Sequence, residues 1–265
     1  MRRILLTLAV LGLVASCKKS PTGPEPGPGP SPSPTPTPES TVVYFGLDST
    51  FIYRDSTYIF SSDSSSVDTL KRTFFDAITS GTFLMVPFRD STYSSGQVRD
   101  DTFKVSGDSL YLRIRFSMDT ISLGVVLDYL VGVKPLEVGQ TWSPLRTTTY
   151  PLTDSLISPQ TGCTLFVYFD SLKIDSSRAH VQDTLTVTTP LDTYTGAYRV
   201  IYENYLNLFF HTQGCLTLNG SASITMKDTS YYKTYYGLVR SDVFTKVVSL
   251  VSTDSTKVHR VLVGR

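Results

Sequence analysis

The sequence predicts an all-β protein built on a single large antiparallel sheet that is strongly bent, as a half-barrel or a sandwich. Segments in which apolar and polar residues alternate recur throughout residues 41–265, and no segment shows a convincing apolar stripe with the helical period of 3.6 residues. The composition agrees with this, because Ser and Thr supply 68 of the 265 residues while Glu, a strong helix former, occurs only four times.

An export signal is predicted at residues 1–16. Two arginines precede an apolar segment at 4–14, which is shorter than the roughly 20 apolar residues that span a bilayer. The segment VASC follows at 14–17 and resembles the lipobox of bacterial lipoproteins. This resemblance implies that Cys17 becomes the lipidated first residue of the mature protein, with palmitate-type acyl chains as its membrane anchor. The alternative is an ordinary secretory signal cleaved near Ser16, with Cys17 incidental.

Residues 17–40 are predicted to be a disordered linker. Nine of the 15 prolines lie within 21–40, so this segment has few amide donors and little to bury. At about 3.1 Å per residue it reaches roughly 60 Å, which suits a spacer between lipid and domain better than a ligand for a partner domain. In some envelopes an Asp directly after the lipidated Cys retains a lipoprotein in the inner membrane, but here Lys18 follows Cys17. The lipoprotein resemblance therefore implies the outer membrane, and both its periplasmic face and its surface face stay open as locations.

The remaining residues, 41–265, contain every aromatic residue of the chain and are expected to form one antiparallel β domain. The clearest alternation is LYLRIRF at 110–116, where four apolar side chains face one way. A helix is considered only at 121–133, where apolar residues are almost continuous. Similar alternation predicts strands at 164–174, 179–188, 197–203, 216–226, 243–251 and 257–263.

Turn signals separate these segments. Asn219-Gly220 predicts a two-residue hairpin turn, since both positions of such a turn favour a positive φ. Fifteen of the 19 Asp residues precede Ser or Thr, and an Asp side chain that accepts from the amide two residues on would start a turn. Ten of these pairs continue with Thr, Leu or Ile, and so resemble the acceptor motif of a periplasmic O-glycosylation system. Both interpretations stay open.

A catalytic site is not expected. Gly107-Asp108-Ser109-Leu110 has the signature of the GDSL esterases, but a predicted strand follows it instead of a helix, and Asp254 and His259 are five residues apart where those enzymes have three. We therefore interpret 107–110 as a turn. The three histidines lie far from one another in the sequence, and neither a metal nor another cofactor is predicted.

Six residues are candidates for a structural bond or for binding. Cys163 and Cys215 each stand at the expected start of a strand, and a disulfide between them would contribute roughly 4 kcal/mol; the alternative is two unpaired thiols. Tyr231, Lys233 and Tyr235 share one face of a predicted strand, which suits either a platform for a sugar or lipid headgroup or cross-strand aromatic pairs. Trp142 is a further binding candidate, with a buried turn anchor as the alternative.

Three segments, LEVGQTW at 136–142, TGAYRVIYE at 195–203 and YYGLVRSDVF at 235–244, are similar to a loose set of exported bacterial β-rich proteins of unknown function. That resemblance implies a bent sheet like the half-barrels that carry lipoproteins or lipids across a periplasm. With 24 Lys and Arg against 23 Asp and Glu, nucleic acid is not an expected partner. We expect a lipid-anchored cell-envelope protein with a non-catalytic binding or structural role toward a lipid, glycan or protein. The alternative is an envelope hydrolase acting on glycan or ester substrates.

Overall fold

The computed structural model describes residues 49–94, 96–118, 121–133, 135–153, 155–160, 163–234, 237–249 and 253–265. Within these residues the regular structure is entirely β, and all the strands join in one antiparallel sheet, which confirms the predicted fold class. The described part of the chain contains no helix that is long and apolar enough to cross a membrane. The predicted signal at 1–16 and the linker at 17–40, with Cys17, lie outside the described residues.

The sheet has fifteen strands in the order β10-β11-β12-β13-β14-β15-β1-β2-β4-β5-β6-β7, with β3 added beside β4 and with β8 and β9 added beside β11. The strands are β1 Thr50–Ile59, β2 Ser64–Phe74, β3 Ile78–Ser80, β4 Phe83–Thr92, β5 Val98–Ser106, β6 Ser109–Met118, β7 Ile121–Val133, β8 Thr141–Trp142, β9 Thr149–Pro151, β10 Ser155–Gln160, β11 Cys163–Thr188, β12 Thr193–Gly214, β13 Leu218–Lys233, β14 Gly237–Ser249 and β15 Thr253–Gly264.

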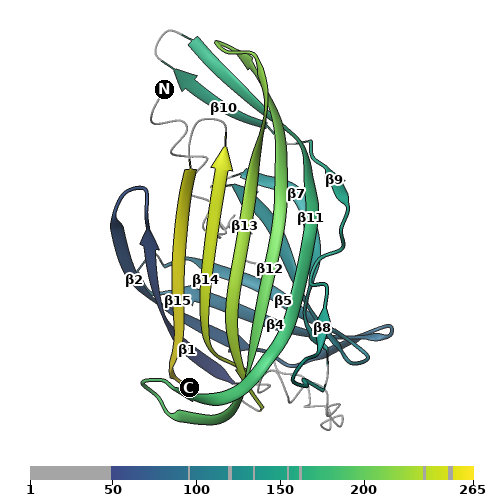
Figure 1. Cartoon of the computed structure of the whole chain (residues 1–265), viewed down its shortest axis with the longest axis vertical. Coiled ribbons are helices and arrows are strands. Elements are labelled where there is room, and N and C mark those ends of the chain that lie inside the picture. The colour runs from purple at the N-terminus through teal and green to yellow at the C-terminus, as the bar shows by residue number, and fades with distance from the viewer. Residues whose placement is uncertain are drawn as a thin grey trace, which may run out of the picture.

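The sheet bends so far that its two parts face each other. In Figure 1, β4 and β5 pass behind β12–β15 at a steep angle. The first described strand, β1, joins the two parts because it pairs with β15 on one side and with β2 on the other. The protein is therefore a half-barrel made of one sheet, and not a sandwich of two separate sheets.

The long strand β12 shows why the alternating sequence folds in this way. From Val200 to Thr212 every second side chain is buried, while the residues between them are partly or fully exposed. One face of the strand therefore meets the core and the other meets water, as the alternation predicts. Burial of an aliphatic side chain such as Leu208 contributes about 1.5–3 kcal/mol.

Bulges bend β11, which the sequence had suggested was two strands. Its pairing with β12 shifts register at four places, and two of these shifts fall at Asp170 and Asp175. A bulge adds a residue to one strand and increases its local twist and bend. The buried positions accordingly change from odd-numbered (Val167) to even-numbered (Leu172) and back to odd-numbered (Ala179).

The structure closes one open alternative about local structure and contradicts one prediction. Residues 121–133, where a helix was considered, form the strand β7. Asn219-Gly220 is not a turn, because both residues lie inside β13, opposite His211 and Phe210 of β12. A glycine is needed there for space, since a Cβ atom on Gly220 would lie 2.8 Å from Cζ of the Phe210 ring.

The tetrapeptide at 107–110 is the predicted turn. Gly107 and Asp108 connect β5 to β6, Ser106 pairs with Ser109, and Gly107 has a φ of 54°. That left-handed conformation costs glycine least, which explains the residue at this corner.

The Asp-Ser and Asp-Thr pairs differ from their predicted role. Nine of them lie inside strands, and in the described residues only those at Asp63, Asp108 and Asp192 lie in turns or loops. Several of these carboxylates accept from the amide of the next residue and not from the amide two residues on: Asp68, Asp101, Asp192 and Asp254. Most of the described pairs therefore lie in extended backbone instead of starting hairpins.

The concave side of the sheet holds two apolar clusters. The first core includes Phe51, Phe88 and Phe103 from one part of the sheet and Tyr202 from the other. The second core includes Leu127, Phe169, Ile174, Leu206 and Leu208. Tyr129 of β7 packs against both clusters, so it marks the boundary between them.

Candidate functional site

A cavity of about 280 Å³ lies on the concave side, close to this boundary. Nine strands contribute side chains to its wall: β1, β2, β5, β6, β7, β12, β13, β14 and β15. Ligand sites in proteins are typically concave and lined mostly by apolar and aromatic side chains, with a few placed polar groups. The cavity has this character and is close to the lower end of the usual volume range.

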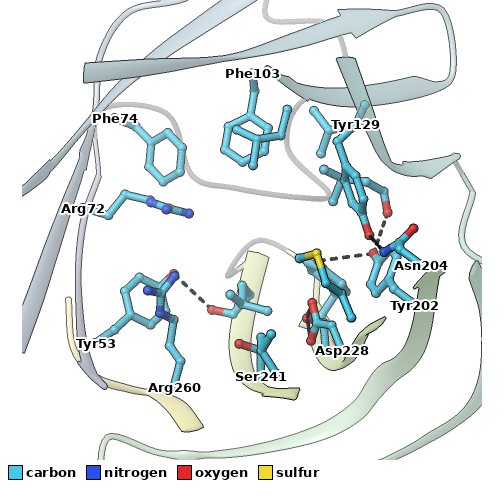
Figure 2. Close-up of a pocket in the computed structure, with 18 residues that line it drawn as sticks. Tyr53, Arg72, Phe74, Phe103, Tyr129, Tyr202, Asn204, Asp228, Ser241 and Arg260 are labelled. Atoms are coloured by element: carbon cyan, nitrogen blue, oxygen red, sulfur yellow. Dashed lines mark hydrogen bonds between the residues drawn. The ribbon is translucent and has the colours of Figure 1, made fainter. Parts of the chain in front are cut away.

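The wall combines three kinds of side chain. Its aromatic members are Tyr53, Phe74, Phe103, Tyr129, Tyr202 and Tyr232. Its aliphatic members and methionine are Leu110, Leu112, Val131, Met226, Leu238 and Val243. Its polar members are Arg72, Asn204, Asp228, Ser230, Ser241 and Arg260. Figure 2 shows Tyr53, Arg72 and Arg260 on one side of the cavity, and Tyr129, Tyr202 and Asn204 on the other.

Both arginines of the wall are held by aspartates on neighbouring strands. Arg260 donates to Asp55 through Nε and Nη2, at 2.8 and 2.6 Å, and Arg72 donates to Asp90 through the same atoms, at 2.7 Å each. Burial opposes the charge of each guanidinium, but the paired carboxylate outweighs burial and raises the pKa of Arg72 and of Arg260 above the usual value. We call these two pairs the ion-pair row. Each guanidinium is neutralised locally, although both border the cavity.

A chain of buried hydrogen bonds fixes the opposite wall. The amide of Leu145 donates to Ser177 Oγ at 2.9 Å, and Ser177 Oγ donates to Asn204 Oδ1 at 2.6 Å. Asn204 Nδ2 in turn lies 3.3 Å from the hydroxyl of Tyr129, to which it donates. Asn204 is only 3% exposed, so these bonds satisfy a polar group that would otherwise be costly to bury. They hold the Tyr129 ring in place at the cavity.

Tyrosine hydroxyls continue this polar region. Tyr202 donates to the carbonyl of Val131 at 2.6 Å, and its hydroxyl oxygen is 3.3 Å from that of Tyr232. Burial raises the pKa of both phenols well above their ordinary value, so they stay protonated at neutral pH. On the other side, burial raises the pKa of Tyr53 to about 12, and its hydroxyl donates to the carbonyl of Leu238 at 3.1 Å.

Asp228 is the carboxylate of the cavity wall. The side chain is partly buried. The hydroxyl of Ser230 donates to this carboxylate, and Ser230 Oγ lies 2.9 Å from Oδ1 and 3.0 Å from Oδ2. Burial raises the pKa of Asp228 from 3.8 to about 7, while Ser230 and the more distant charge of Arg260 act in the opposite direction. No Lys, Arg or His of the described chain forms an ion pair with it. Asp228 thus differs from the two aspartates of the ion-pair row.

The predicted aromatic platform is not a free surface. Tyr231 is buried, with the guanidinium of Arg240 5.3 Å from its ring centre, and Lys233 Nζ donates to the carbonyl of Thr195 at 2.7 Å. Neither residue lines the cavity, and Tyr235 lies outside the described residues. The structure instead directs Tyr232, on the opposite face of the same strand, into the cavity wall.

Trp142 supports the site without lining the cavity. Its indole Nε1 donates to the carbonyl of Leu130 at 3.0 Å, and its ring meets Tyr202 edge-on, with 6.0 Å between ring centres. The side chain is half-buried and packs against the first core. Its position agrees with the anchor interpretation, since it braces a wall residue from behind.

The structure places the backbones of the two cysteines predicted to pair close to each other. Cys163 begins β11, and Cys215 directly follows the end of β12 instead of starting a strand. The amide of Cys215 donates to the carbonyl of Thr164 at 3.3 Å, which places its backbone beside the residue after Cys163. This proximity agrees with the disulfide, which stays a prediction.

The three histidines do not reach the cavity. His211 Nδ1 lies 2.7 Å from Asp170, and His259 Nδ1 lies 2.7 Å from Asp242, in both cases at half-exposed positions. Asp254 and His259 both lie in β15. Asp254 stands opposite Val247 of β14, whereas the His259 ring bonds to Asp242, so Asp254 and His259 do not form the Asp-His pair of an esterase. Among the described residues no group of three His, Cys, Asp or Glu side chains could hold a metal ion.

No protein-family model matches the chain, and no curated protein matches its sequence. Among solved structures, the chain is similar to a candidate exported protein with a YmcC-like fold from Bacteroides fragilis, at 12% identity and a TM-score of 0.40, over 84% of this chain and 98% of that one. It is also similar to a candidate lipoprotein from Parabacteroides distasonis, at 11% identity and a TM-score of 0.39, over 83% and 97% of the two chains. Both likenesses are distant and say nothing about the cavity.

Proposed function

We propose that the protein is a lipid-anchored cell-envelope protein, placed at the outer membrane, whose sheet binds a small amphipathic molecule without transforming it. The cavity carries the binding part of this proposal: about 280 Å³, with twelve apolar or aromatic side chains and six polar ones in its wall. An apolar part of a ligand would gain about 25 cal/mol for each Å² that it buries there, and the polar groups would fix its orientation.

The anchoring part of the proposal rests on the sequence. The signal at 1–16, Cys17 and the proline-rich segment to residue 40 have the order of anchor and spacer expected for a domain held near a membrane. A protein with such an anchor would meet lipids and envelope glycans directly, and these are the proposed sources of the ligand.

The cavity is tested by filling it. Val243→Phe adds a ring at a wall position, whereas Val138→Phe makes the same change at a position that is 59% exposed and outside the cavity. The full chain carrying Cys17→Ser, purified without detergent, is titrated with the neutral fluorescent probe N-phenyl-1-naphthylamine. We expect saturable binding that Val243→Phe weakens at least tenfold and Val138→Phe leaves within twofold.

Overpacking costs about 1–3 kcal/mol, so thermal unfolding of Val243→Phe must show a folded protein at the assay temperature. Leu112→Phe, on another strand of the wall, provides a second blocked variant. Equal probe binding by the parent and both wall variants would contradict a ligand site in the cavity.

The anchor is tested by metabolic labelling with a fatty-acid analogue. We expect the native chain to take up label and to stay with membranes, and Cys17→Ser to lose both properties, because the thiol of Cys17 is the proposed acceptor. Undiminished label in the Cys17→Ser chain would show that the lipid is attached at a residue other than Cys17.

A further inference from the structure

We propose that the cavity recognises a cationic group of its ligand, a primary or quaternary ammonium, through the carboxylate of Asp228, while the tail of the ligand lies along the aromatic and aliphatic wall. This inference rests on the proposed function, because it requires a ligand in the cavity, and it adds the chemical class of that ligand.

The first step is the balance of charge around the cavity. Three formally charged side chains line it: Arg72, Arg260 and Asp228. Each guanidinium is already neutralised by two hydrogen bonds to its own aspartate in the ion-pair row, with the paired carboxylates 15–17% exposed. Asp228 has no ion pair in the described chain, so the cavity presents one uncompensated negative charge when this carboxylate is ionised.

The second step is the hydrogen-bonding capacity that is left. An ionised carboxylate has about four lone-pair sites, and Ser230 supplies a single hydroxyl hydrogen to the Asp228 carboxylate. Acceptor capacity therefore remains for an N–H donor from a ligand. A charged donor would form the stronger, charge-assisted kind of hydrogen bond.

The third step is the aromatic surface near this carboxylate. Figure 2 shows Tyr202 and Tyr129 on the side of the cavity where Asp228 lies, with Phe103 across from it. Faces of aromatic rings attract cations within about 6 Å of the ring centre, by about 0.5–2 kcal/mol each. A carboxylate beside tyrosines suits an ammonium group better than a phosphate or a carboxylate, both of which Asp228 would repel.

The fourth step is the effect of pH. Burial raises the pKa of Asp228 to about 7, so a cation that binds the ionised form must gain affinity as the pH rises toward 8. The ionisable groups around this carboxylate are Tyr232 on the same strand, Tyr202 on β12, Asp242 on β14, Arg260 on β15 and Tyr129 on β7. Raised pKa values keep the three phenols protonated and Arg260 charged between pH 5 and 8, so only Asp228 among the cavity-lining groups has a pKa placed to change charge there.

The experiment compares three probes with one tail. Octylammonium, octanol and octanoate each displace N-phenyl-1-naphthylamine from the full chain carrying Cys17→Ser, at pH 5 and at pH 8. We expect octylammonium to bind at least tenfold more tightly than octanol at pH 8 and octanoate to bind most weakly. Lowering the pH to 5 should reduce the octylammonium affinity about tenfold or more and leave octanol within twofold.

Asp228→Asn removes the charge at nearly constant shape, and Asp108→Asn makes the same change at an exposed turn residue. We expect Asp228→Asn to abolish the preference for octylammonium and its pH dependence, while Asp108→Asn preserves both. Equal affinity for the three probes, or a preference for octanoate, would overturn the cationic ligand and leave the cavity function standing. Failure of the fluorescent probe to bind the parent chain at all would overturn both proposals.

Discussion

Arg72→Met is expected to lower the free energy of unfolding by about 3–5 kcal/mol at pH 7, the usual result when one partner of a buried ion pair is removed. The side chains of Arg72 and Asp90 are 13% and 15% exposed, and two hydrogen bonds of 2.7 Å join them. Methionine fills similar space but leaves the Asp90 carboxylate without its main donor. Urea unfolding followed by circular dichroism measures the change.

Two controls separate the lost pair from the lost side chain. Arg89→Met breaks a similar two-bond pair with Asp100, but these side chains are 52% and 64% exposed, so a change of at most about 1 kcal/mol is expected. Replacing both partners, as Arg72→Met with Asp90→Leu, should recover much of the lost stability, since no unpaired charge remains. A double variant as unstable as Arg72→Met alone would contradict this explanation.

Asp228→Asn is expected to stabilise the fold at pH 8 and to have little effect near pH 4. Burial raises the pKa of this carboxyl in the folded protein from 3.8 to about 7. Between these values the folded state binds more protons than the unfolded state, so wild-type stability falls as the pH rises. A pKa rise of about three, at about 1.36 kcal/mol each, sets an upper limit of about 4 kcal/mol.

Asparagine does not titrate, so this loss should disappear in the variant. We expect an excess stability of about 2–4 kcal/mol at pH 8 that declines as the pH approaches 4, measured by urea unfolding across that range. The exposed Asp108→Asn change should follow the wild-type curve within about 0.5 kcal/mol. A constant difference at all pH values would show that Asp228 acts through packing and not through its charge.

The alternation of residues in β13 contained more of the site than we predicted from it. Its inward positions run from Ala222 and Ile224 through Met226 to Asp228 and Ser230, so an apolar row becomes polar in the middle of the sheet. The strand that we predicted at 216–226 ends just before this change from apolar to polar residues. Continued by two-residue steps, the same pattern would have placed Asp228 on the buried face, where a carboxylate without a partner indicates a functional group.

Strand type was easier to predict than strand extent. The single strand β11 was predicted as two because its buried positions change parity at the bulges near Asp170 and Asp175, which interrupts a strict two-residue period. The inward row of the same strand becomes regular again at Ala179. Bulges depend on pairing with β12, and a single-strand pattern does not contain that information.

The cavity as a whole could not be predicted because its wall is assembled by long-range pairing. Tyr53 and Arg260 meet only because β1 pairs with β15, and Tyr129 faces Tyr202 only because the sheet bends. Alternation states which side of a strand is buried, but it does not state which other strand lies opposite. Tyr231, a predicted binding residue, is buried beside the guanidinium of Arg240 and does not line the cavity.

The pairing of β1 with β15 also sets the order in which the protein can fold. Hydrogen bonds between Arg260 and Asp55 join residues 205 positions apart, so one edge of β1 has no partner until nearly the whole polypeptide has been made. Contacts so distant along the chain are entropically expensive to form early and make folding slow. The cavity is consequently one of the last features to form, and newly made chains must pass through a period with open strand edges.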